Sequence, residues 1–221
     1  MRRQYRKIFP IYWGKIVNNV YTRTYTAPPV NEREILRYIG VKDNNPSPEL
    51  LALVRECLSS IEGKLTYKVC FGEFDLSLGE SVKLSDMNIC SRDLLKNLSG
   101  CKSAFVFAAT VGIEIDRLIA RNSATSPAKA LIFDGIGGER IESLCDAFCR
   151  DMAQNKAREG YSLRPRFSAG YGDFSIRAQR DIFRLLDCPK NLGLTLLDSM
   201  VMSPTKSVTA IVGVAEKQEE K

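Results

Sequence analysis

The chain has 221 residues, of which 44% are hydrophobic and 26% are charged, with 9 Pro, 15 Gly and a formal net charge of +6. This composition is typical of a globular domain and excludes a disordered or collagen-like chain. The sequence contains no histidine, which excludes Ser-His-Asp and Cys-His nucleophiles and every histidine-ligated metal site. No apolar run approaches the roughly 18 to 20 residues of a membrane-spanning helix, so we expect no membrane interaction.

Basic and aromatic residues dominate residues 1–30. The first 23 residues contain no acidic residue, and their basic residues are Arg2, Arg3, Arg6, Lys7, Lys15 and Arg23. No helix-turn-helix, RNP or finger motif accompanies this charge, so we expect a solvated extension that binds no nucleic acid. Its six aromatic residues leave open that it packs on a neighbouring surface. Pro10 and Trp13 interrupt what would be a secretory core, which favours a cytoplasmic protein.

Local patterns predict one mixed domain over residues 31–214, followed by a charged tail at 215–221. Capping residues and apolar spacing predict helices at residues 31–40, 47–63, 91–98, 113–121, 127–159 and 175–186. Extended segments are expected at residues 64–78, 103–110, 192–202 and 208–214, with a hairpin or bulge near Gly72. Residues 103–110 form the most continuous apolar run, which predicts the central strand. The order of elements indicates an α+β or irregular α/β fold.

Three glycines lie early in the long predicted helix, at Gly135, Gly137 and Gly138. A phosphate-binding loop is excluded because no Lys-Ser/Thr follows and no G-x-G-x-x-G follows a strand. We expect these glycines to let the helix pack closely on the sheet.

Seven cysteines form an odd set without a C-x-x-C pair, which argues against a zinc or iron–sulfur site. Cys145 and Cys149 would share one helix face, but two thiolates do not complete a tetrahedral site. We therefore predict buried thiols and no bound metal.

Residues 164–173, RPRFSAGYGD, have neither helical nor strand periodicity and are expected to form a binding loop. The guanidinium of Arg166 suits a carboxylate, and Tyr171 can lie against a planar group. Gly170 and Gly172 allow the backbone to approach a ligand. The alternative is an ordinary loop whose arginine binds the carbonyls of the same loop.

Several motifs follow one another over the second half of the chain. Residues 166–171 read Arg-Phe-Ser-Ala-Gly-Tyr, and residues 194–204 read Leu-Thr-Leu-Leu-Asp-Ser-Met-Val-Met-Ser-Pro, with Ser-Val at 207–208. These are similar to Arg-x-x-x-Gly-Tyr, Leu-Thr-Glu-Ser-x-Ala-Met-x-Pro and Ser-Val in the activation domain of cobalamin-dependent methionine synthase, which binds S-adenosylmethionine. Residues 31–40 and 107–112 look like the stand-alone members of that family, and the resemblance covers residues 30–214.

The resemblance implies a mixed, largely antiparallel sheet with packed helices. It also implies a reactivation subunit that presents S-adenosylmethionine for the reductive methylation of cob(II)alamin. A partner protein would carry the cobalamin, and an electron donor such as flavodoxin or ferredoxin would supply the electron. The chain would need no catalytic acid, base or nucleophile of its own, which suits a sequence without histidine.

The same resemblance assigns the binding residues. Arg166 would bind the carboxylate of the methionine moiety, and the loop residues that line the ligand would be Ser168, Ala169, Gly170 and Tyr171. Asp146 is a candidate for an ammonium or hydroxyl contact, with Glu142 one turn earlier as a second candidate. Arg164 competes for the arginine role, but its spacing to the Gly-Tyr pair selects Arg166.

The chain departs from the family at Phe167, Ala169 and Gly172, which replace prolines of the multidomain enzymes and leave a looser loop. The competing hypothesis is a docking or scaffold protein for another corrinoid methyltransferase system, without S-adenosylmethionine.

Overall fold

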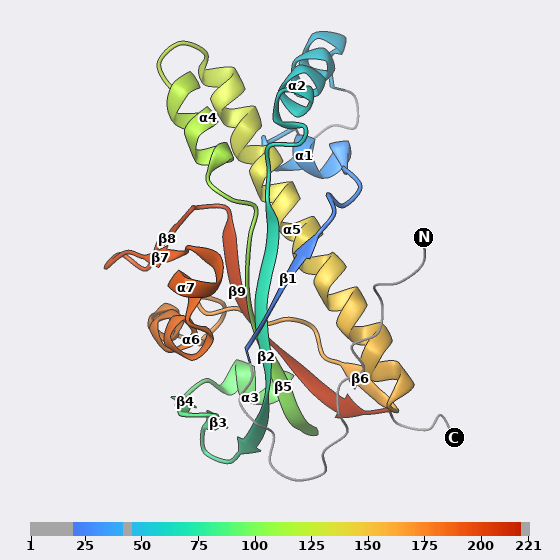
Figure 1. Ribbon diagram of the computed structural model, residues 1–221, viewed down its shortest axis with the longest axis vertical. Helices are drawn as coiled ribbons and strands as arrows, with labels where there is room; N and C mark the ends of the chain where they lie inside the picture. Colours follow the sequence, from blue (N-terminus) through green and yellow to red (C-terminus); the bar gives the residue numbers. More distant parts are fainter. Residues whose placement is uncertain (1–19, 42–45, 218–221) are drawn as a thin grey trace.

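The computed structural model describes residues 20–41 and 46–217 (Figure 1). Residues 1–19 and 218–221 lie outside this part of the chain. They include the basic residues up to Lys15 and most of the aromatic extension, so the structure does not test the expectations about them. The helices are α1 (Glu32–Tyr38), α2 (Pro48–Ile61), α3 (Arg92–Asn97), α4 (Glu114–Asn122), α5 (Pro127–Arg158), α6 (Gln179–Leu186) and α7 (Cys188–Leu192), with a 3-10 turn, η1 (Ile176–Ala178), before α6. The strands are β1 (Tyr21–Tyr25), β2 (Tyr67–Leu78), β3 (Val82–Leu84), β4 (Met87–Ile89), β5 (Cys101–Thr110), β6 (Tyr161–Leu163), β7 (Thr195–Leu196), β8 (Met202–Ser203) and β9 (Ser207–Glu216).

Three helices begin at the capping residues that the sequence indicates. The side chains of Asn31, Ser47 and Ser91 each accept a hydrogen bond from the backbone N–H three residues later. These bonds satisfy N–H groups that have no partner within the helix. The predicted starts of α1, α2 and α3 are confirmed.

One antiparallel sheet forms the centre of the fold, in the order β4-β3-β2-β5-β9-β6, with β1 also paired to β2. The prediction that residues 103–110 form the central strand is confirmed, because β5 lies between β2 and β9 over most of its length. β1 falls within the expected extension, and no sequence pattern predicted it.

Both faces of the sheet are covered by helices, which explains why residues 104–109 of β5 are all apolar and buried. Phe105 and Phe107 of β5 face the core formed with α5, α1, α2 and α4. Ala104 and Val106 face the other core, where α3, α6 and α7 pack. In Figure 1, α5 runs obliquely along the sheet and extends beyond it to meet α1, α2 and α4.

Two expectations about strands are wrong. No hairpin or bulge occurs at Gly72, because β2 runs through it in register with β5. The change of periodicity instead marks where β2 exchanges neighbours, from β1 up to Phe71 to β3 from Leu76. Residues 192–202 do not form one strand, since they contain only the end of α7 and the short β7–β8 pair.

The glycines of α5 do allow close packing, mainly against neighbouring helices. A Cβ on Gly135 would lie 2.5 Å from Cγ2 of Ile39, just after α1. A Cβ on Gly137 would lie 2.8 Å from Cγ2 of Ile115 in α4 and equally close to the side chain of Lys206, directly before β9. The expectation of close packing on the sheet holds only for Gly137, beside the residue that precedes β9, because the three glycines lie on the part of α5 where α1 and α4 pack.

Candidate functional site

The loop of residues 164–173 is held to the sheet at its beginning. After β6, the backbone N–H of Arg164 donates to the carbonyl of Gly213 in β9 at 2.8 Å. Phe167 then exchanges two hydrogen bonds of 2.9 Å with Ile211 of the same strand. These bonds continue along β9 from the β6 pairing, so the backbone on both sides of Arg166 has a defined position.

Beyond Phe167 the loop turns tightly. Gly170, at a positive φ of 98°, donates its N–H to the carbonyl of Phe174 at 2.8 Å. The side chain of Ala169 is buried in the core on the α6 side, whereas Tyr171 is 69% exposed. The loop therefore uses Ala169 as an anchor and presents Tyr171 to solvent.

Arg166 lies opposite two carboxylates of α5. Its Nη2 atom donates to Oε2 of Glu142 at 2.7 Å and to Oδ1 of Asp146 at 2.9 Å. The arginine side chain is only 26% exposed, while Glu142 is 42% and Asp146 63% exposed. The structure brings together the three charged residues that the sequence analysis selected, although they are 20 and 24 residues apart.

The other terminal nitrogen of Arg166, Nη1, is buried and has no hydrogen-bond partner within the part of the chain that the structure describes. A buried donor without a partner is costly and uncommon, so this nitrogen is suited to an incoming acceptor such as a carboxylate. Burial alone would lower the pKa of Arg166, but the acidic groups around it, among them the carboxylates of Glu142 and Asp146, outweigh it and raise that pKa. The guanidinium is therefore permanently charged.

Two thiols lie on the same face of α5. Burial raises the pKa of Cys145 strongly and that of Cys149 to about 11. Both thiols are therefore protonated and uncharged at neutral pH. Among the described residues, no group of three or more cysteine or acidic side chains is arranged to hold a metal ion.

A cavity of about 370 Å³ lies beside Arg166. Its walls come from the loop, α5 and β9, and the lining residues are Glu142, Arg166, Phe167, Ser168, Tyr171 and Val208. The cavity is thus lined by apolar side chains, an exposed aromatic ring and charged groups, which is the usual composition of a small-molecule site.

The two arginines of the loop have different surroundings. Nη2 of Arg164 donates to the carbonyl of Ser99 at 2.9 Å, just before β5, and Arg164 does not line the cavity. Its guanidinium therefore ties the loop to the turn before β5, and because Ser99 lies outside residues 164–173 this is not the bond to the loop's own carbonyls that the alternative required. Arg166 is the arginine that faces the carboxylates and the cavity.

Asp173 fastens the end of the loop to α3, a contact that the sequence analysis missed. Its carboxylate accepts hydrogen bonds from the hydroxyl of Ser91 and from the backbone N–H groups of Arg92 at 2.8 Å and Asp93 at 3.2 Å. The bond from Ser91, followed by those from the backbone, lowers the pKa of Asp173. The position of Asp173 at the end of a glycine-rich loop was the signal in the sequence that could have indicated this contact.

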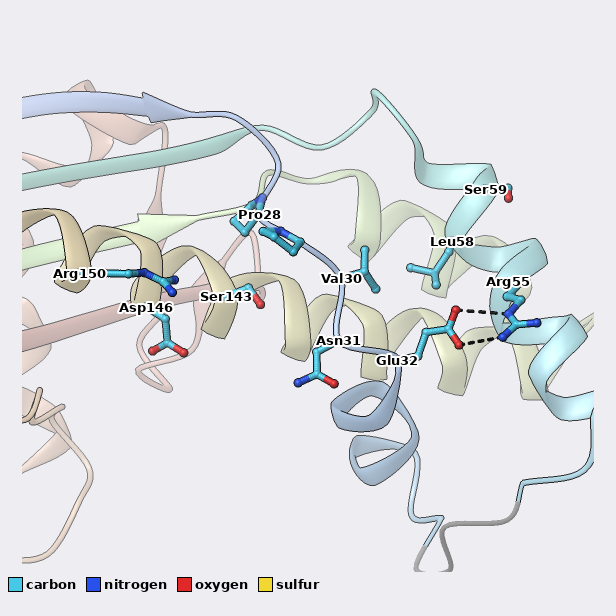
Figure 2. Close-up of a pocket in the computed structure, with 11 residues that line it drawn as sticks. Pro28, Val30, Asn31, Glu32, Arg55, Leu58, Ser59, Ser143, Asp146 and Arg150 are labelled. Atoms are coloured by element: carbon cyan, nitrogen blue, oxygen red, sulfur yellow. Dashed lines mark hydrogen bonds and ion pairs between the residues drawn. The ribbon is translucent and has the colours of Figure 1, made fainter.

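A second cavity, of about 940 Å³, lies on the other side of Asp146 (Figure 2). Residues 28–32 cross it, α2 lines one end with Arg55 and Leu58, and α5 lines the other with Ser143, Asp146 and Arg150. Figure 2 shows Asp146 and Arg150 on the same side of α5. Asp146 therefore stands between Arg166 and this larger cavity.

A buried ion pair holds the crossing segment to α5. Arg140 and Glu139 are each 2% exposed, and Nη2 of Arg140 donates to Oε1 of Glu139 at 2.6 Å. Arg140 also donates to the carbonyls of Pro28 at 2.7 Å and Pro29 at 2.8 Å, while Glu139 accepts from the N–H of Asn31 at 3.1 Å. Nothing in the sequence pattern of the helix distinguished these two residues as buried.

Comparisons by sequence find no match: no family model matches the chain, and neither does any curated protein. The crystal structure of the MetH reactivation domain bound to AdoHcy has a similar fold, with a TM-score of 0.67 and 15% sequence identity. The similarity covers 92% of this chain and 80% of that chain. The predicted α+β fold, with a largely antiparallel sheet and packed helices, is confirmed. Within residues 20–41 and 46–217, no helix has both the length and the apolar character to cross a bilayer.

Proposed function

We propose that this chain binds S-adenosylmethionine beside Arg166 and acts as a reactivation subunit of a cobalamin-dependent methionine synthase. The buried Nη1 of Arg166, which lacks a partner among the described residues, is the observation that carries the proposal. A ligand carboxylate would satisfy this donor with a charge-assisted hydrogen bond. The fold shared with a reactivation domain that binds AdoHcy supports the same ligand class.

The residues around the cavity suit each part of an S-adenosyl amino acid. Arg166 would bind the carboxylate, and Glu142 and Asp146 lie where an ammonium or sulfonium would be attracted. Ser168 and Tyr171 line the cavity, and Tyr171 offers a ring to a planar group. S-adenosylmethionine, when bound, would supply a methyl group made electrophilic by the sulfonium.

The chain's own contribution would then be to bind the methyl donor, orient it and exclude water. Positioning alone can supply a large part of a rate enhancement without an acid, a base or a nucleophile from the protein. This suits a chain without histidine. In this proposal a cytoplasmic partner protein carries the cobalamin, and an electron donor such as flavodoxin or ferredoxin reduces it.

A second function follows from a different feature of the same site. Arg166 already has two carboxylate partners within the chain, which suits a structural arginine in a docking or scaffold protein. Such a protein would associate with a corrinoid partner without binding the methyl donor.

Isothermal titration of the purified chain with S-adenosylmethionine separates the two functions. We expect saturable binding that S-adenosylhomocysteine displaces, because both ligands carry the same amino acid carboxylate. Absence of heat up to millimolar ligand, for the chain alone and for the chain with its cobalamin-carrying partner, would support the scaffold function.

A further inference from the structure

Asp146 and Glu142 share one hydrogen-bond donor. Both carboxylates accept a hydrogen bond from Nη2 of Arg166, so two negative charges lie beside one guanidinium. A ligand carboxylate that binds Arg166 would bring a third negative charge to the same group. Like charges at such short range repel one another, which favours the departure of one of the two internal carboxylates.

Asp146 is the partner that is held less firmly. Its oxygen lies 2.9 Å from Nη2, compared with 2.7 Å for Glu142, and it is 63% exposed, compared with 42%. Asp146 also lines the cavity shown in Figure 2, which Glu142 does not. The larger cavity gives the Asp146 side chain room to turn away from Arg166.

Arg150 is the cation on that side. It lies one helical turn after Asp146 on α5 and lines the same cavity. In the ranges that the structure describes, its guanidinium has no ion pair or hydrogen bond. An acidic residue four positions before a basic one is the favourable order for an ion pair along a helix.

We propose that Arg150 is a positioning residue that receives the carboxylate of Asp146 when a ligand carboxylate takes its place on Arg166. The inference rests on the proposed function, since it requires that Arg166 bind a carboxylate. The exchange would let the two oxygens of the ligand carboxylate span Nη1 and the place that Asp146 leaves on Nη2, without leaving Asp146 unpaired beside them. Glu142 would keep its place on Arg166 and, of the two carboxylates named in the proposed function, would be the one left to contact a positive group of the ligand.

Titrations with two ligands test this role. S-adenosylmethionine has the carboxylate that starts the exchange, whereas decarboxylated S-adenosylmethionine keeps the sulfonium and the amine but lacks that carboxylate. We expect Arg150→Gln to weaken binding of S-adenosylmethionine by about two- to fivefold, the effect of one exposed helical ion pair or slightly more. Binding of the decarboxylated ligand should be unchanged.

Two controls keep the result specific. Arg158→Gln removes an exposed arginine two turns further along α5 and should change neither affinity. Arg150→Lys should restore most of the lost affinity, and the free energy of unfolding of ligand-free Arg150→Gln should equal that of the wild type.

Equal affinity of wild type and Arg150→Gln for S-adenosylmethionine would overturn the role of Arg150, and so would an equal loss for both ligands. A wild-type chain that binds neither ligand would instead overturn the proposed function and this inference with it.

Discussion

Nη2 of Arg166 lies 2.7 Å from Oε2 of Glu142, so an ion pair joins the loop after β6 to the middle of α5. The two residues are 24 positions apart and belong to different elements. The pair sets the direction of the guanidinium, and it leaves Nη1 buried without a partner among the described residues. In the proposed function, the arginine that joins the loop to α5 would also bind the ligand.

Arg166→Ala should weaken binding of S-adenosylmethionine by about 1.5 to 3 kcal/mol, the range of a charge-assisted hydrogen bond. Titration calorimetry of the variant measures the loss. Arg164→Ala is the matched control, because Arg164 bonds to the carbonyl of Ser99 and should leave the affinity unchanged. Full affinity in Arg166→Ala would remove this residue from the site.

Gly135→Ala should destabilise the fold even though alanine favours helices. Its Cβ would lie 2.5 Å from Cγ2 of Ile39, and overpacking of this kind costs about 1 to 3 kcal/mol. Gly138→Ala is the control on the same helix, because the nearest atom, in Tyr38, is 3.5 Å away. It should stabilise the fold by about 0.5 to 1 kcal/mol. Urea unfolding of both variants checks this, and equal effects would contradict the close packing of α5 on α1.

Arg140→Met should lower the free energy of unfolding by about 3 to 5 kcal/mol, because Glu139 would remain buried as an unpaired charge. The carbonyls of Pro28 and Pro29 would also lose their donors. In contrast, Arg184→Met removes an exposed ion-pairing arginine and should cost less than about 1 kcal/mol. Denaturant unfolding measures both, and a loss below about 1 kcal/mol in Arg140→Met would show that the pair contributes little.

Asp173→Asn should destabilise the chain near neutral pH, with a deficit that shrinks in acid. The folded pKa of Asp173 lies below its ordinary value of 3.8, because Ser91 and backbone N–H groups donate to the carboxylate. A lowered folded pKa stabilises the fold above the unfolded pKa, and this contribution is lost as pH falls through the folded pKa. Urea unfolding from neutral pH to below pH 3.8 measures the deficit.

The control for Asp173 is Asp198→Asn, which changes an exposed side chain in the turn between β7 and β8 and should cost little stability. A deficit of Asp173→Asn that stays constant with pH would show that the hydrogen bonds to α3 do not depend on the charge of the carboxylate.

Local signals in the sequence determined much of the fold. Asn31, Ser47 and Ser91 marked the starts of three helices, because capping bonds join residues only three positions apart. The apolar run at 103–110 predicted the central strand, because a strand covered on both faces needs no polar side. The loop at 164–173 stood out by its lack of periodicity.

Tertiary structure decided the contacts that join distant segments. Glu142 and Asp146 were predicted as ligand contacts, and only the folded chain pairs them with Arg166. The burial of Arg140 beneath residues 28–31 depends on where that segment crosses α5. Such contacts follow from the packing of elements far apart in the chain, and capping and periodicity describe only neighbours within one element.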